Sequence, residues 1–265
     1  MPLLAIPLGL LIGLALGALG GGGSILTVPA LVYVLGQDPR AATTSSLLIV
    51  GTASLFALIP HARAGHVRVG QGLLFGALGT AGSLAGSALS ARVPPQVLLT
   101  AFAALMLVVA ALMLRHHDMG EQDGREAEPI IRFRPFACDG ARVAKVVLTA
   151  TAVGLLTGFF GVGGGFALVP ALVLVLGYAM PVAVGTSLLV IAVNSGTALA
   201  ARIGMGVGDL DWTLIAVFTA AAMAGSLLGG RITARANPRH LSRAFAALLI
   251  VVALYTAARS LPTLF

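Results

Sequence analysis

The chain has 265 residues, of which 58% are hydrophobic and 9% charged, and its formal net charge is +7. Soluble domains carry about 25% charged residues, so this composition excludes a soluble globular protein and indicates one embedded in lipid. Apolar runs of about 20 residues match membrane-spanning helices, whereas a β-barrel would need shorter segments that alternate between apolar and polar residues. The basic residues are spread over short loops without aromatic partners, which argues against nucleic acid as a partner.

The first predicted element is an apolar helix over residues 3–19, followed by the glycine run Gly20–Gly23 and a short apolar segment over 24–35. The short segment has about 12 residues, roughly 18 Å of helix, and cannot cross a hydrocarbon core of about 30 Å. Pro29 lies within it and removes one helical hydrogen bond. We therefore expect a re-entrant hairpin with a glycine tip, and two full crossings stay open. Three longer helices are predicted next, over residues 41–60, 69–91 and 96–114.

The second half of the chain repeats this pattern at an offset of 141 residues. The segment GGGGSILTVPALVYVLG, Gly20–Gly36, aligns with GVGGGFALVPALVLVLG, Gly161–Gly177, and both contain VPALV. The long polar stretch 115–141 joins the two copies. The sequence thus predicts an all-α integral membrane protein made of two repeats, 1–114 and 142–265, each with a glycine-tipped hairpin and three transmembrane helices.

The positions of the basic residues predict how the copies lie in the membrane. If each long segment crosses once and the loop with Arg63 is cytoplasmic, 12 basic residues lie inside and four outside, in agreement with the positive-inside rule. Equivalent loops of the two copies then face opposite sides, which is the pattern of inverted-topology repeats in secondary transporters. We expect both termini to be extracytoplasmic and the linker 115–141 to be cytoplasmic.

The acidic residues exclude some transport substrates. All nine lie in loops or at segment ends, whereas cation transporters and proton pumps normally hold a buried carboxylate. Helix N-termini with free N–H groups can bind an anion without basic side chains, so an anion is the favoured substrate. The expected binding residues are the two glycine tips and the hydroxyl and amide side chains at similar depth. They are Gly20, Gly21, Gly22, Gly23, Ser24, Thr44, Ser45, Ser46, Ser54, Gly161, Gly163, Gly164, Gly165, Thr186, Ser187, Asn194 and Ser195.

Each of these assignments has a structural alternative. A hydroxyl in a membrane helix can simply bond the preceding turn, and a glycine can simply allow two helices to pack closely. For the tips we favour the binding role. Close packing is the interpretation that we prefer for four other glycines in small-xxx-small spacing, Gly82, Gly86, Gly225 and Gly229.

Three residues at the membrane edges are candidates for a gate or vestibule: His61, Arg63 and Arg202. Snorkelling and orientation are the usual roles of such residues. The single cysteine, Cys138, and the scattered histidines have no ligand-spaced neighbours, so no metal site and no cofactor are expected. The sequence contains no P-loop and no nucleophile with a base, so we expect no enzyme.

The doubled motifs resemble the TauE/SafE family of sulfite and organosulfur anion exporters. The resemblance is carried by GGGGSILTVPAL, AATTSSL and RAGHV in the first copy and by GVGGGFALVPAL, AVGTSL and RIG in the second, and it covers essentially the whole chain. It implies a secondary anion permease of the bacterial inner membrane that exports small sulfur-containing anions such as sulfite or sulfoacetate along a path lined by these motifs. A passive anion channel and a non-transporting membrane assembly partner stay open as alternatives, and so does a homodimer.

Overall fold

The computed structural model describes residues 2–90, 93, 95–118, 140–160, 165–203, 210–233 and 236–260. Within these ranges the chain forms helices joined by short turns, without any strand. In the first half α1 spans Pro2–Leu19, α2 Gly21–Pro29, the π-helix η1 Ala30–Val34, α3 Pro39–Arg63, α4 Val69–Ser90 and α5 Pro95–Asp118. In the second half α6 spans Gly140–Phe160, α7 Leu168–Pro170, the π-helix η2 Ala171–Val175, α8 Met180–Ile203, α9 Trp212–Thr233 and α10 Pro238–Ser260.

The lengths of the helices fit a protein that crosses a membrane several times. Among the described residues α3, α4, α8, α9 and α10 are long and apolar enough to span a bilayer, and the apolar stretches of α1, α5 and α6 are shorter. Many leucine, isoleucine and valine side chains on their outer faces are exposed, as lipid-facing positions require. The expected fold class, an all-helical integral membrane protein, is confirmed.

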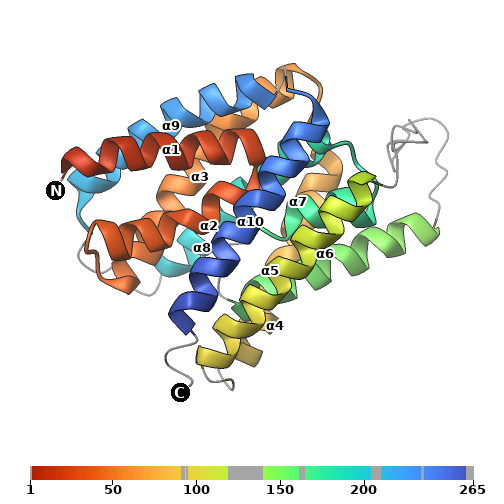
Figure 1. Cartoon of the computed structure of the whole chain (residues 1–265), viewed down its shortest axis with the longest axis horizontal. Coiled ribbons are helices and arrows are strands. Elements are labelled where there is room, and N and C mark those ends of the chain that lie inside the picture. Colours follow the sequence, from red (N-terminus) through yellow and green to blue (C-terminus); the bar gives the residue numbers. More distant parts are fainter. Residues whose placement is uncertain are drawn as a thin grey trace.

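The two halves of the chain are intertwined rather than separate (Figure 1). The first helix of each half packs along the fourth helix of the other half, α1 against α9 and α6 against α4. The third helices, α3 and α8, pack against each other, and so do the fifth helices, α5 and α10. The pattern of neighbours is therefore the same when the two halves are exchanged. This agrees with a duplicated unit, while the opposite orientation of the two copies stays a prediction.

The two hairpins share an unusual local structure. Each has a five-residue π-helix directly after its proline, Ala30–Val34 after Pro29 and Ala171–Val175 after Pro170. Each π-helix ends before a glycine in the left-handed region, Gly36 and Gly177, both with φ 68°. Proline has no N–H to donate to the carbonyl four residues before it, and the wider π-turn follows at that point in both hairpins. At each proline the helix thus continues with a change from α-helix to π-helix.

The limits of the short helices differ from those expected. The first begins at Gly21, three residues before the expected Ser24. The second begins at Leu168, three residues after Gly165, the residue that corresponds to Ser24 at the offset of 141. The turn in the first hairpin is therefore made by Gly20 alone, which has φ 66°, and Gly21–Gly23 form the first turn of α2. Glycine is a poor helix former in water, but buried backbone in a membrane protein needs internal hydrogen bonds.

Small residues bring the exchanged helix pairs into backbone contact. A Cβ on Gly13 of α1 would overlap the carbonyl group of Ala222 in α9. A Cβ on Gly86 of α4 would likewise overlap the Leu155 carbonyl oxygen in α6, and one on Gly82 would lie 2.6 Å from the carbonyl oxygen of Thr151. Gly225 and Gly229 have equivalent contacts with α1. The packing role predicted for Gly82, Gly86, Gly225 and Gly229 is confirmed.

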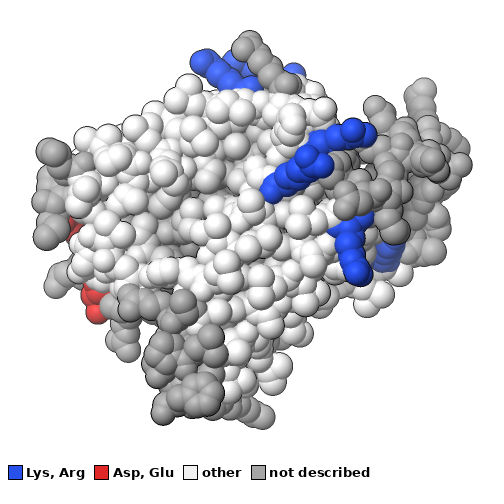
Figure 2. Space-filling view, in the orientation of Figure 1, with Lys and Arg blue, Asp and Glu red and all other residues white. Residues whose placement is uncertain are grey.

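The basic and the acidic side chains lie in different parts of the molecule. In Figure 2 the visible basic side chains lie at the top and right, and the acidic ones lie at the left. The described acidic side chains are those of Asp38 and Asp211. The described basic side chains are Arg63, Arg68, Arg115, Lys145, Arg231, Arg239 and Arg243, and all belong to the loops expected on the cytoplasmic side. The side chains of the four arginines expected outside, Arg40, Arg92, Arg202 and Arg259, lie outside the described residues.

Candidate functional site

The two hairpin tips meet inside the helical bundle. A methyl group on Gly21 would overlap the carbonyl group of Gly165, and one on Gly165 would lie 2.8 Å from the Cα atom of Gly21 and 2.5 Å from Ser24 Oγ. Both glycines are buried. The chain segments of the two copies therefore touch backbone to backbone at this point. Gly161, Gly163 and Gly164, the rest of the second tip, lie outside the described residues.

The first tip also rests on the third helix of the second copy. A Cβ on Gly20 would overlap Ser187 Oγ and would lie 3.3 Å from the carbonyl oxygen of Val184, both in α8. Since Gly20 has a positive φ, it makes this close approach in a conformation that residues with a Cβ rarely adopt. The structure thus gathers Gly20, Gly21 and Ser24 of one copy with Gly165 and Ser187 of the other.

The N-terminus of α2 gives this site its electrostatic character. The first N–H groups of a helix have no partner within the helix and carry its partial positive charge. In α2 these groups belong to Gly21, Gly22 and Gly23, of which Gly23 makes only a long bond to the carbonyl oxygen of Gly20, at 3.4 Å. No acidic residue lies in the first turn, and the glycines are buried. The tip therefore presents amide donors in an apolar environment, where they favour negative charge.

The serine hydroxyls at the tip bond to their own helices in this structure. Ser24 donates to the carbonyl oxygen of Gly21 at 2.7 Å, and Ser187 donates to that of Val184 at 2.8 Å. In α3, Ser46 likewise donates to Thr43 at 2.8 Å. These are the bonds to the preceding turn that membrane helices commonly form. Because a hydroxyl rotates freely, Ser24 and Ser187 can exchange these acceptors for an oxyanion.

The described part of the site is closely packed. A Cβ on Gly22 would lie 2.6 Å from Leu248 Cδ2, and one on Gly23 would lie 2.5 Å from the backbone nitrogen of Leu16. Of these neighbours only Leu248 contributes the far end of a flexible side chain. Entry of a ligand beside the tip therefore requires movement of Leu248 or of the opposite hairpin. The close contacts also explain, by packing alone, why glycine is needed at these positions.

Two buried hydroxyls lie unpaired in α3. Ser45 and Ser54 are both 0% exposed, and neither Oγ has a partner among the described residues. A buried hydroxyl without a partner costs about 1–3 kcal/mol. A ligand or water molecule that bonds to Ser45 or Ser54 would remove this cost. Thr186 in α8, in contrast, accepts a hydrogen bond from the backbone N–H of Arg68 at 3.2 Å. It joins the α3–α4 turn to the start of α8.

Asn194 and Ser195 lie away from the tips. They are about two turns, roughly 10 Å, beyond Ser187 along α8. Asn194 Oδ1 accepts a hydrogen bond from Thr80 Oγ1 in α4 at 3.2 Å. Ser195 packs at the α3–α8 contact, where a Cβ on Gly51 would lie 3.0 Å from its Cβ. Both side chains thus join helices rather than line the tip.

The three residues expected at the membrane edges have different surroundings. His61 is 0% exposed, and its Nε2 atom lies 3.1 Å from the carbonyl oxygen of Gly17 in α1. It joins α3 to α1 and does not snorkel. Arg63 is exposed, and the side chain of Arg202 lies outside the described residues. His61 lies on the same face of α3 as Val50, Ala53 and Ala57, all of which are buried. The spacing of three or four residues between them is visible in the sequence and could have predicted that His61 is buried.

The base of the second hairpin holds a polar contact that the sequence pattern does not indicate. Tyr178 lies in the turn between η2 and α8, and its hydroxyl donates a hydrogen bond to Gln71 Oε1 in α4. Both side chains are buried. Burial raises the pKa of Tyr178 to about 12, although Arg68 acts to lower it. The contact holds the base of the second hairpin against the start of α4.

Replacing Tyr178 with phenylalanine should destabilise the protein at neutral pH by about 1–3 kcal/mol, because Gln71 loses a buried partner. Because the pKa of Tyr178 is higher in the folded protein than in the unfolded chain, the neutral phenol makes its full contribution to stability below about pH 10. This contribution is lost as the pH rises from about 10 toward 12. The difference between the two proteins should therefore shrink over this range. Thermal unfolding in detergent at a series of pH values tests this, with the exposed Tyr255→Phe as control. Parallel stability curves for native protein and Tyr178→Phe would contradict it.

The fold and site define a multi-pass helical membrane protein in which two hairpins of a duplicated unit meet. The family model "Sulfite exporter TauE/SafE" matches residues 5–256. A "Probable membrane transporter protein" of Xylella fastidiosa (strain 9a5c) is 36% identical over 258 residues, 94% of this chain and 92% of that protein. The "Probable membrane transporter protein YunE" of Bacillus subtilis is 27% identical and covers 92% of each chain. No solved structure matches the chain. The chain belongs to the sulfite exporter TauE/SafE family of membrane transporters.

Proposed function

We propose that the protein is a secondary transporter that exports small sulfur-containing anions, such as sulfite or sulfoacetate, across the bacterial inner membrane. The observation that carries the proposal is the contact of the two hairpin tips, where the amide end of α2 lies beside Gly165 and Ser187 of the other copy. Two oppositely oriented hairpins that meet in this way give one site that can open to either side. The choice of sulfur-containing anions as substrates rests on the name of the matching family.

The substrate-binding groups in this proposal are the amides of Gly21 and Gly22 with the hydroxyls of Ser24 and Ser187. In the closed arrangement seen here the two hydroxyls bond to backbone carbonyls. Separation of the tips would free the amides and allow both hydroxyls to turn toward an oxyanion. The absence of acidic residues from the first turn of α2 leaves the positive end of the helix uncompensated. Hydrogen bonds to a charged group are worth about 1.5–3 kcal/mol each.

The orientation that we propose places the basic end of the molecule in the cytoplasm. The described basic side chains lie in the loops around Arg63, Arg68 and Arg231 and at the ends of α5, α6 and α10, and short cytoplasmic loops carry an excess of such residues. Both termini are then extracytoplasmic. Access alternates as one hairpin and its partner helices move against the other, with Arg63 at the cytoplasmic entrance.

Flux into proteoliposomes tests the proposal and separates it from its rivals. Labelled sulfite, sulfoacetate and taurine should be compared in parallel. A carrier gives saturable uptake and counterflow, while a passive channel gives neither and a non-transporting assembly partner gives no flux above empty liposomes. Saturable, sulfur-anion-specific counterflow is the expected result. Uptake that rises linearly with concentration would overturn the carrier in favour of the channel.

Replacing Ser187 with alanine should raise the half-saturation concentration for the anion about tenfold or more, because one hydrogen bond to a charged ligand is lost. The fold should be retained, since the lost bond runs within a single helix. Ser87→Ala is the matched control: Ser87 also donates to the carbonyl three residues before it, at 3.0 Å, but on an exposed face of α4. Equal half-saturation values for the two variants would show that Ser187 does not touch the substrate.

A further inference from the structure

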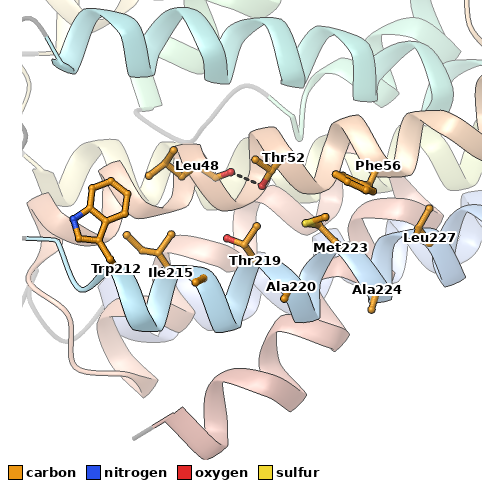
Figure 3. A pocket seen from close by; sticks show the side chains of 11 residues that line it. Leu48, Thr52, Phe56, Trp212, Ile215, Thr219, Ala220, Met223, Ala224 and Leu227 are labelled. Carbon is orange, nitrogen blue, oxygen red and sulfur yellow. Dashed lines mark hydrogen bonds between the residues drawn. The ribbon is translucent and has the colours of Figure 1, made fainter.

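A groove runs along the outside of the bundle between α3 and α9 (Figure 3). Its volume is about 550 Å³, and Leu48, Thr52 and Phe56 of α3 face Ile215 and Met223 of α9 across it. The Thr52 hydroxyl is occupied by the carbonyl oxygen of Leu48, at 2.6 Å. Thr219 also lines the groove, and its hydroxyl has no partner among the described residues. Apart from these two hydroxyls and the indole of Trp212 the lining side chains are apolar, which suits a hydrocarbon chain better than a small anion.

The groove continues into a second hollow of about 360 Å³ at the end of the two helices. Leu227 lines both hollows. On α3 the lining residues Leu48, Thr52, Phe56, Ile59 and Arg63 follow each other at spacings of three or four, so they share one helical face. From residue 48 to residue 63 this face is roughly 22 Å long, which is more than one leaflet of a hydrocarbon core of about 30 Å.

The far hollow carries two positive charges. Arg63 and Arg231 both line it, together with Ile59, Pro60, Ala64 and Leu227. Both arginines are exposed, and within the part of the chain that the structure describes neither forms an ion pair. Two guanidinium groups that share one small hollow repel each other, and their planar donors match the oxygens of a phosphate. An anion between them relieves the repulsion.

The position of the groove identifies the kind of anion. The neighbouring side chains Leu55, Ile59, Leu228 and Ile232 are large, apolar and exposed, as expected of a surface in contact with lipid. The arginines lie at one end of the groove, and Trp212, a residue typical of the membrane interface, lies at the other. An occupant that extends from the charged hollow into the groove must carry an anionic head and a long apolar tail.

We propose that the α3–α9 groove binds one anionic phospholipid, with its phosphate between Arg63 and Arg231 and an acyl chain along the groove toward Trp212. None of the residues that line the groove or the hollow belongs to the hairpin tips, although Arg63 is also the residue proposed at the cytoplasmic entrance. Anionic lipids are concentrated in the cytoplasmic leaflet, and each arginine near such a surface contributes about 1 kcal/mol. Because α9 packs against both α1 and α3, the lipid would hold together helices of both repeats.

The test uses the full chain, delipidated in detergent. Long-chain phosphatidylglycerol should remain bound in native mass spectrometry and raise the unfolding midpoint, while phosphatidylcholine of the same chain length should do so much less. The double variant Arg63→Gln with Arg231→Gln should bind phosphatidylglycerol about tenfold more weakly or worse. Arg243→Gln, at an exposed arginine of α10, is the matched control and should bind it normally. Ala220→Leu, which narrows the groove, should weaken binding without changing the charge.

Three results would overturn the proposal. The first is equal binding of phosphatidylglycerol and phosphatidylcholine, or unchanged binding in the double variant. The second is stabilisation by inorganic phosphate as large as that by the lipid, which would make the hollow a site for a free ion. The third is efficient disulfide cross-linking between two copies of Ala220→Cys in a Cys138→Ser background, in lipid vesicles, which would make the groove a surface between subunits.

Discussion

Replacing Gly21 with alanine is expected to destabilise the protein by about 3 kcal/mol or more and to abolish anion transport. The added methyl group would overlap the carbonyl group of Gly165. Because this obstacle is backbone rather than the end of a flexible side chain, the two hairpins must separate. The amide end of α2 would then lose its place beside Ser187. Unfolding midpoint in detergent and counterflow in proteoliposomes measure the two effects.

Gly196→Ala provides the control for Gly21→Ala. Gly196 lies in α8, and a Cβ there has no neighbour within 4 Å. Alanine is the better helix former by about 1 kcal/mol, so this variant should fold and transport at least as well as the native protein. If Gly21→Ala behaved like Gly196→Ala in both measurements, the two tips would not be in contact in the membrane.

Replacing Gly13 with valine should prevent correct assembly of the bundle. Gly13 lies in the middle of α1, and even the Cβ atom of a new side chain would overlap the backbone of Ala222 in α9. One turn earlier in α1, a Cβ on Gly9 would lie 2.8 Å from the carbonyl oxygen of Phe218. Because α1 and α9 are in close backbone contact at both positions, a shift of one turn of α1 cannot make room for the valine. We expect a loss of several kcal/mol, about 3 or more, and a large fall in the yield of folded protein.

Gly196→Val is the matched control for Gly13→Val, since it makes the same substitution in a helix where space is open. Folded yield, measured by fluorescence size-exclusion chromatography, and unfolding in a denaturing detergent both measure the effect. A native yield and stability for Gly13→Val would mean that α1 and α9 are farther apart than the structure places them. Transport should be lost with the fold, because α1 ends at Leu19, directly before Gly20 of the first tip.

The fold was predictable from composition and repetition. The low charge and the apolar runs predicted membrane helices, and the shared VPALV motif predicted that Pro29 and Pro170 would have equivalent surroundings, as the two π-helices show. The helix limits at the tips were predicted less well. Local propensity placed Gly21–Gly23 in a turn, but contacts with Gly165, Leu16 and Leu248 bury them. Such contacts join parts of the chain that are far apart in sequence.

The candidate site was predictable in its residue types but not in its partners. The sequence singled out the glycines and Ser187, yet only the fold shows that Gly20 of one copy lies against Ser187 of the other. Asn194 had the expected depth, but its carbonyl oxygen is used by Thr80. His61 was expected at an edge because it lies near the end of its helix, and the neighbouring α1 covers it instead.

The most direct test of the anion site is a structure determined with a bromine-labelled small sulfonate. We expect anomalous bromine signal beside the first hairpin tip, with sulfonate oxygens within hydrogen-bonding distance of the amides of Gly21 or Gly22 and of the Ser187 hydroxyl. We also expect Ser187→Ala to weaken the signal. A transported sulfonate found only elsewhere, with the tips as closely packed as they are here, would contradict it.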